Sequence, residues 1–161
     1  MGTSTDGILV YGYDLGYPED WKIENLTEDG TLNLPWYDEE SEDADDFGEA
    51  VQTRLLAELT GFTETWEDAV EAGTTDSHFG RKGAAEKQLK VDIVAHCSDD
   101  YPMFLLASRK VSAARGYPED VTDEIAADVT ADREHLTAAL AALGITPKQT
   151  EPRWILASLW G

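Results

Sequence analysis

The chain of 161 residues has little cysteine, few basic residues and no long hydrophobic runs. Its single cysteine, Cys97, excludes an internal disulfide framework, which fits a reducing compartment. No run of 18 apolar residues occurs, and no basic segment followed by an apolar run stands at the start. We therefore expect neither a membrane span nor a secretory signal, and we predict a cytoplasmic protein that does not contact membranes.

Basic residues number 12 against 33 acidic ones, so the formal net charge is −21. Residues 1–72 hold 20 acidic and two basic residues, a balance of −18, whereas residues 73–161 hold 13 acidic and 10 basic residues, a balance of −3. This asymmetry predicts an acidic face rather than a uniformly acidic surface. Because phosphate contacts need clusters of Lys and Arg, we expect no direct binding to nucleic acid. Three explanations of the negative charge remain: a partner protein with a basic surface, a bound metal ion, or simple solubility.

Strand patterns occur in four segments. Residues 89–96 alternate apolar and polar side chains, turn-favouring residues follow, and residues 102–109 begin with a short apolar run, which predicts a β-hairpin near the middle of a sheet. Residues 7–13 are apolar on both faces and rich in β-formers, and residues 153–160 also have a strand composition. We expect residues 14–18 to end the first of these strands.

Helical periodicity is strongest in two segments. Apolar residues recur every fourth position in residues 47–60, with Asp45 or Asp46 as the N-cap, and an apolar stripe runs through residues 118–143 with a break near Thr130. A short helix is expected over residues 63–70, and the glycine-rich residues 73–83 are expected to form a loop.

Together these elements predict a single α+β domain over residues 1–161. We expect a two-layer sandwich, in which a mainly antiparallel four-stranded sheet is packed by two to three helices.

Residues 38–49 contain eight acidic residues in twelve, a density typical of solvated loops and interaction tails. We expect an acidic loop at about residues 38–46. Two aromatic residues precede it, and exposed aromatic side chains can anchor a partner that acidic residues attract over distance. The predicted interaction residues are Trp36, Tyr37, Glu39, Glu40, Asp43 and Asp46.

A nucleophile, a base and carboxylates lie together in sequence only at His96, Cys97 and Asp99. A catalytic thiol needs a neighbouring base to form the thiolate, but adjacent strand residues point to opposite faces. A single cysteine after a strand is more often a small buried apolar residue. The sequence has no HxH, HExxH, CxxC, P-loop or GxSxG motif, so we expect no specific metal site and no cofactor.

Three stretches, residues 6–16, 96–107 and 152–161, resemble small uncharacterised proteins of actinobacterial phages and mobile elements. The resemblance assigns no activity and no site residue. What it implies is a context, because phage accessory proteins often bind and inhibit a host protein, here in the host cytoplasm.

We therefore expect a non-enzymatic acidic protein-interaction module, in its more specific form a phage-encoded modulator or inhibitor of a host protein with a basic surface. One alternative is a DNA mimic that inhibits a nucleic-acid-binding protein. The other is a small enzyme that uses His96, Cys97 and Asp99.

Overall fold

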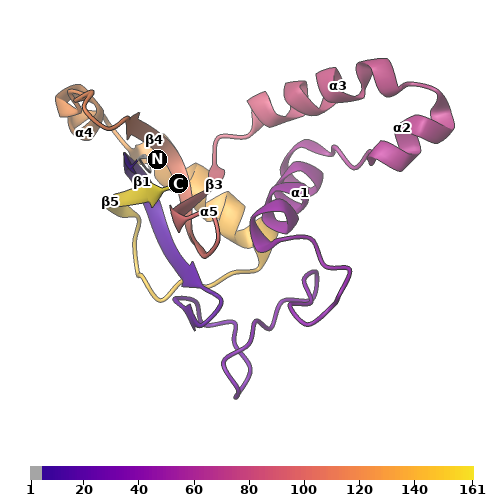
Figure 1. Ribbon diagram of the computed structural model, residues 1–161, viewed down its shortest axis with the longest axis horizontal. Helices are drawn as coiled ribbons and strands as arrows, with labels where there is room; N and C mark the ends of the chain where they lie inside the picture. Colours follow the sequence, from indigo (N-terminus) through magenta and orange to yellow (C-terminus); the bar gives the residue numbers. More distant parts are fainter. Residues whose placement is uncertain (1–4) are drawn as a thin grey trace.

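The computed structural model describes residues 5–161, which form an α+β fold of five strands and five helices (Figure 1). The predicted fold class is confirmed. In chain order the elements are β1 (Thr5–Tyr17), β2 (Asp20–Trp21), α1 (Phe47–Thr60), α2 (Trp66–Ala72), α3 (Thr75–Gln88), β3 (Asp92–Ser98), β4 (Pro102–Ala113), α4 (Thr122–Ala126), α5 (Thr130–Leu143) and β5 (Arg153–Trp160).

The five strands form one mixed sheet in the order β2-β1-β4-β3-β5, and β5 also pairs with β1. The β1–β5 pairing is antiparallel and runs from Thr5 and Trp160 to Gly12 and Arg153. Between β3 and β5 the pairing is parallel and is confined to Cys97 and Ser98. Because β5 pairs with both β3 and β1, the sheet curls until β1, β4, β3 and β5 form a closed ring of paired strands.

Curling gives the sheet two apolar layers. Inside the curl lies a small cluster of Ile8, Val10, Val94, Leu105 and Ala107. On the outer side a larger core joins the sheet to α1 and α5, and it includes Tyr11, Leu55, Phe104, Leu136 and Leu143. This arrangement explains why β1 is apolar on both faces.

Local sequence signals set the ends of the main helices. Asp46 is the N-cap of α1, and its carboxylate accepts a hydrogen bond from the backbone N–H of Gly48 at 2.8 Å. Gly61 ends α1 in a left-handed conformation with φ of 75°. The long helix predicted over residues 118–143 is divided into α4 and α5, and α5 begins at Thr130, where the break was expected.

Two local predictions are wrong. β1 continues to Tyr17 instead of ending at Asp14, because a register irregularity and the positive φ of Gly16 bend the strand without ending it. Residues 73–83 form the C′ glycine of α2 and most of α3 rather than a loop. Tertiary packing outweighs the low helix propensity of glycine in α3, since His78 and Ala85 are buried against neighbouring elements.

α2 and α3 form a helical hairpin, here called the arm, which extends away from the sheet and α5 (Figure 1). Glu64, which lies just before α2, contacts two residues of α3 and so holds this helix in place. Its carboxylate is 2.5 Å from Nδ1 of the buried His78 and accepts hydrogen bonds from Nε and Nη2 of Arg81 at 3.1 and 2.7 Å. These charge-assisted contacts lower the pKa of Glu64, with the hydrogen bonds from Arg81 as the largest cause.

The attachment of the arm is therefore expected to weaken at acidic pH. A carboxyl group whose pKa is lowered by folding stabilises the fold above its ordinary pKa, here 4.5, and loses that contribution as the pH falls through the lowered value. Fluorescence of Trp66, whose ring lies 5.7 Å from that of His78, should report the change. We expect the Glu64→Gln variant to show the altered emission already at neutral pH. The control is Glu67→Gln on the exposed side of α2, and a Glu64→Gln titration that matches the parent would contradict the assignment.

Within residues 5–161, no helix combines the length and apolar character needed to cross a bilayer.

Candidate functional site

The three catalytic candidates lie at the tip of the β3–β4 hairpin, but no hydrogen bond or ion pair found within residues 5–161 joins them. Cys97 pairs with Pro102 on β4 and with Leu159 on β5, and it is half-buried. It is the one non-glycine residue in the described part of the chain with a positive φ, 75°. A strained backbone is often found at functional sites, but here no neighbouring base is seen to act on the thiol.

Burial lowers the pKa of His96, and the nearby charges of Asp14 and Lys22 act in opposite directions. Its Nε2 atom is buried and has no hydrogen-bond partner within residues 5–161. His96 is thus a neutral ring at physiological pH with one nitrogen withdrawn from solvent. The catalytic role of His96, Cys97 and Asp99 stays a prediction.

The two aromatic residues proposed as anchors pack against the main core. Nε1 of Trp36 donates a hydrogen bond to the carbonyl oxygen of Leu143 at 2.7 Å, and the ring of Tyr37 lies 5.5 Å from that of Phe47. Burial raises the pKa of Tyr37, and the charge of Glu39 raises it further. These rings hold the acidic loop against the body rather than projecting from it.

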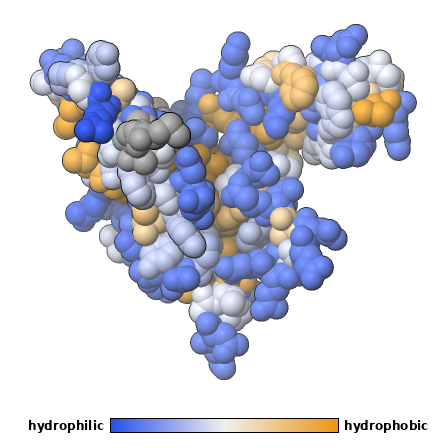
Figure 2. Space-filling model, in the orientation of Figure 1, coloured by the Kyte–Doolittle hydropathy of each residue, from blue (hydrophilic) through white to orange (hydrophobic). Residues whose placement is uncertain are grey.

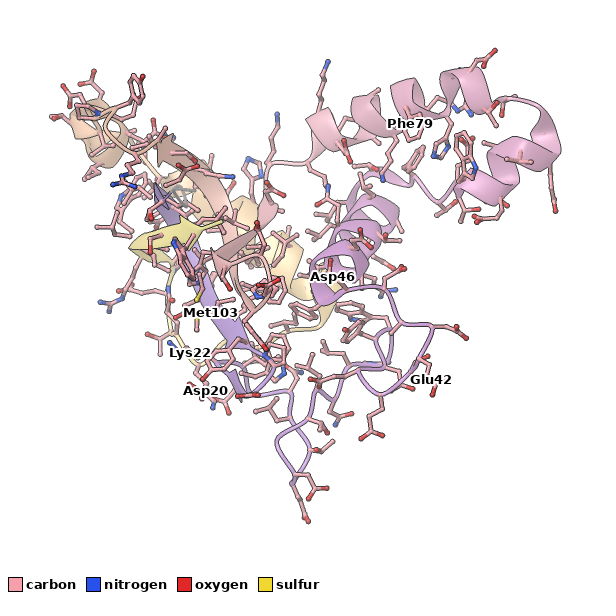
Figure 3. All side chains as sticks on the ribbon, in the orientation of Figure 1. Asp20, Lys22, Glu42, Asp46, Phe79 and Met103 are labelled. Carbon is pink, nitrogen blue, oxygen red and sulfur yellow. The ribbon has the colours of Figure 1, made fainter. Side chains whose placement is uncertain are left out.

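The acidic loop, residues 38–46, follows turns and irregular backbone rather than a helix or strand. Two of its predicted site residues have structural roles: Glu39 accepts a hydrogen bond from the N–H of Leu32 at 3.1 Å, and Asp46 caps α1. Glu40 and Asp43 are exposed. Figure 3 shows Glu42 on the outer side of the loop and Asp46 at the start of α1, so the loop leads from solvent to the body.

At the body end of this loop lies a cavity of about 660 Å³, which we call the acidic pocket. Its floor includes Ile93 and Phe104 from the hairpin, and its walls come from α1, α3 and the β3–β4 turn. No Lys or Arg lines it. The acidic residues that line it are Asp46, Glu49, Glu86, Asp92 and Asp99.

The fold brings these five carboxylates together from distant parts of the sequence. The start of α1 contributes Asp46 and Glu49, where negative charge favours the helix dipole. Glu86 lies in the last turn of α3, where a carboxylate opposes the helix dipole. The sequence analysis identified Asp46 and Asp99 but missed Glu49, Glu86 and Asp92. Glu86 follows the segment 73–83 that was predicted as a loop, and Asp92 lies in the predicted strand 89–96, so no local pattern places either residue beside α1.

Two features of the acidic pocket favour a cationic ligand. Desolvation raises the pKa of Asp92, although its side chain reaches solvent and the charge of Lys110 acts in the opposite direction. Oε1 of Gln52 is buried and has no hydrogen-bond partner within residues 5–161. An unpartnered acceptor beside several carboxylates favours a ligand that supplies both hydrogen-bond donors and positive charge.

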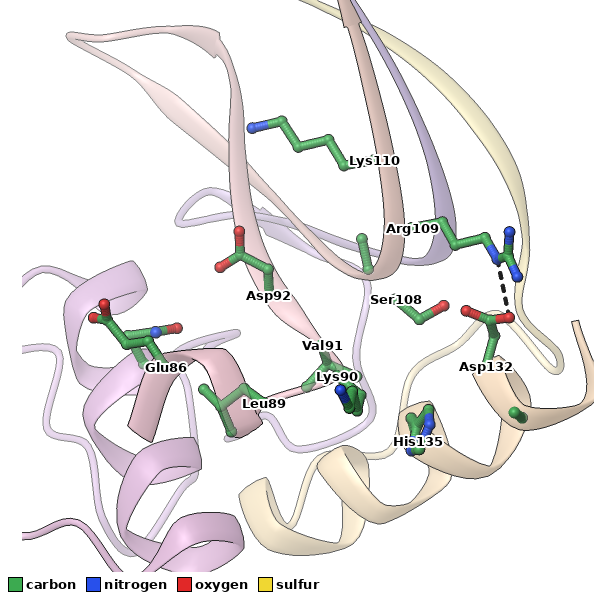
Figure 4. A pocket seen from close by; sticks show the side chains of 13 residues that line it. Glu86, Leu89, Lys90, Val91, Asp92, Ser108, Arg109, Lys110, Asp132 and His135 are labelled. Atoms are coloured by element: carbon green, nitrogen blue, oxygen red, sulfur yellow. Dashed lines mark hydrogen bonds and ion pairs between the residues drawn. The ribbon is translucent and has the colours of Figure 1, made fainter. Parts of the chain in front are cut away.

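A second cavity of about 760 Å³ adjoins the acidic pocket, and the two share Gln52, Glu86 and Asp92. Figure 4 shows Glu86 and Asp92 on one side of this cavity and Arg109 on the other, where its Nε donates to Asp132 at 3.0 Å. Lys90 and Lys110 also line it, so its charges are mixed. The lining that contains acidic but no basic residues is therefore confined to the acidic pocket.

No group of three or more His, Cys, Asp and Glu side chains in residues 5–161 has the arrangement needed to hold a metal ion. No protein-family model matches the chain, and no curated protein or solved structure matches it.

Proposed function

We propose that this protein is a non-enzymatic acidic interaction module that binds a cationic segment of a partner protein in the acidic pocket. The observation that carries the proposal is the convergence of five carboxylates from α1, α3 and the β3–β4 hairpin on a cavity lined by no Lys or Arg. In the biological context suggested by the resemblance, the partner is a host protein with a basic surface, and the module modulates or inhibits it in the host cytoplasm.

The acidic loop and the acidic pocket have different roles in this proposal. The exposed carboxylates of Glu40, Glu42 and Asp43 attract the partner and accelerate its association. The pocket holds an inserted Lys or Arg side chain, whose donors reach Oε1 of Gln52 and whose charge relieves the repulsion around Asp92. Removing loop charge should therefore slow association, whereas removing pocket charge should speed dissociation.

Mimicry of DNA is the less supported form of the same idea. A mimic presents carboxylates at the regular spacing of phosphates on a rigid surface. The acidic loop follows irregular backbone, which provides no such repeat. Attraction of a basic partner needs only the summed negative charge.

The test uses a Lys- and Arg-rich peptide as the probe, with binding measured by isothermal titration calorimetry over a series of salt concentrations. The variant Glu49→Gln, Asp92→Asn, Asp99→Asn removes three pocket charges and keeps the α1 cap at Asp46. We expect its affinity to fall by about 10-fold or more. A close charge pair contributes about 1.5 kcal/mol or more to binding, and about 1.4 kcal/mol corresponds to a tenfold change in affinity. The affinity of the parent should also fall as the pH is lowered through the raised pKa of Asp92, because the cation prefers the ionised carboxylate.

The matched control is Glu28→Gln, Glu119→Gln, Glu134→Gln, which removes the same charge at exposed positions outside the pocket. If both triple variants lose affinity equally, binding follows net charge alone and the pocket is not the site. If the parent binds the peptide with no salt dependence, the proposal is wrong.

A further inference from the structure

The arm exposes an apolar surface formed by Trp66, Val70 and Phe79, here called the aromatic patch (Figure 2). The exposed fractions of these three side chains are 45%, 55% and 69%. The rings of Trp66 and Phe79 stack across α2 and α3 with centroids 5.4 Å apart and an interplanar angle of 28°. Val70 lies one helical turn after Trp66 on the same face of α2. The patch is therefore one continuous surface.

The arm has little intrinsic stability to support such an exposed surface. α2 has only 7 residues and α3 has 14, lengths at which helices depend on packing rather than on propensity. Gly80 and Gly83 interrupt α3, and a Cβ atom at either position would meet nothing within 4 Å. Thr74, the N-cap of α3, makes no side-chain capping hydrogen bond. A covering surface that is always present would stabilise the arm.

Charges around the aromatic patch are self-complementary. α2 carries the exposed Glu67 and Glu71, whereas α3 carries Lys82 and Lys87, together with Asp76 in its first turn and Glu86, which lines the acidic pocket. None of these residues forms an ion pair within residues 5–161, in contrast to Arg81, which is held by Glu64. In a two-fold arrangement residue i of one copy contacts residue j of the other and the reverse also holds, so the acidic side chains of α2 in each copy can face Lys82 and Lys87 of its partner.

We propose that the arm is a self-association surface on which a second copy of this chain docks, aromatic patch against aromatic patch, with α2 of each copy opposite α3 of the other. A foreign basic partner fits the patch less well, because α3 presents positive charge beside it. The net charge of −21 on each copy opposes association, and the patch is small. We therefore expect a dissociation constant on the order of micromolar.

The first experiment is sedimentation velocity of the full chain from micromolar to millimolar concentration. We expect a concentration-dependent dimer in the parent and a loss of affinity of about 10-fold or more in Phe79→Ser, since aromatic anchors dominate interface energies. The control is Tyr101→Ser, because Tyr101 is 81% exposed at the β3–β4 turn and does not belong to the aromatic patch. The control should dimerise like the parent. Circular dichroism checks that each variant is folded.

The second experiment changes the charges and leaves the aromatic patch intact. One variant carries Lys82→Glu and Lys87→Glu, and the other carries Glu67→Lys and Glu71→Lys. Each variant alone should be monomeric, because like charges then face each other at both contacts. Their mixture should form a heterodimer, because both contacts become complementary.

Three results would overturn the proposal: a parent that stays monomeric at millimolar concentration, a dimer unaffected by Phe79→Ser, or charge variants that dimerise alone as well as mixed. Capture of another protein by the aromatic patch of a monomeric chain would also overturn it. None of these outcomes depends on whether the acidic pocket binds a cationic peptide.

Discussion

Replacing Gly12 with alanine is expected to destabilise the protein by more than about 4 kcal/mol, a large part of the roughly 5–15 kcal/mol by which single domains are stable. A Cβ atom at this position would lie 1.8 Å from the carbonyl oxygen of Leu106 and 2.9 Å from Cα of Ala107. Both are backbone atoms of β4 and cannot move aside by rotating a side chain. The register between β1 and β4 shifts between Tyr11 and Gly12, so the two backbones approach closely just where no side chain is present.

The measurement is chemical denaturation of the parent and the Gly12→Ala variant, followed by tryptophan fluorescence. Gly7→Ala is the matched control on the same strand, because a Cβ atom there would make ordinary contacts of 3.8 Å with Ala113. We expect the control to remain within about 1 kcal/mol of the parent. A Gly12→Ala variant as stable as the Gly7→Ala variant would show that β1 and β4 separate at little cost.

Replacing Leu136 with alanine is expected to lower the free energy of unfolding by about 2–5 kcal/mol. Leu136 lies on α5 with none of its surface exposed, in the main core that joins α1, α5 and the sheet. Truncation removes apolar contacts and leaves a cavity that helices anchored on both sides cannot close. Urea denaturation with fluorescence detection measures the loss.

The control for Leu136→Ala is Leu156→Ala on β5, where the side chain is 79% exposed. The same change in chemistry should cost less than about 1 kcal/mol there. Equal losses at the two positions would mean that α5 does not pack as described.

The main strands and helices could be predicted from periodicity, since the segments 47–60 and 153–160 match α1 and β5 to the residue. These segments carry consistent local signals, such as the Asp46 cap and the left-handed Gly61 that delimit α1. α3 could not be predicted in this way. It contains Gly80 and Gly83, and the contacts that stabilise it come from Glu64 and from burial of His78, which no local pattern reveals. The available signal for a helix was the spacing of His78, Arg81 and Ala85, which lie three and four residues apart and so share one helical face.

The candidate site could be predicted only in part. The sequence indicated an acidic surface, and the loop at residues 38–46 leads to the pocket. The predicted anchors Trp36 and Tyr37 are partly buried and pack against the core, where their rings gain contacts that the sequence does not reveal. Glu86 and Asp92 join the site through the pairing of distant elements, so their proximity is a property of the tertiary fold.

α3 contributes to both the acidic pocket and the aromatic patch. Glu86 on its last turn lines the acidic pocket, and Phe79, two turns earlier on the same helix, belongs to the aromatic patch. A change in the position of this helix would therefore alter both surfaces. A pocket ligand that bound the monomer and the dimer with different affinities would shift dimerisation by the same factor, as thermodynamic reciprocity requires.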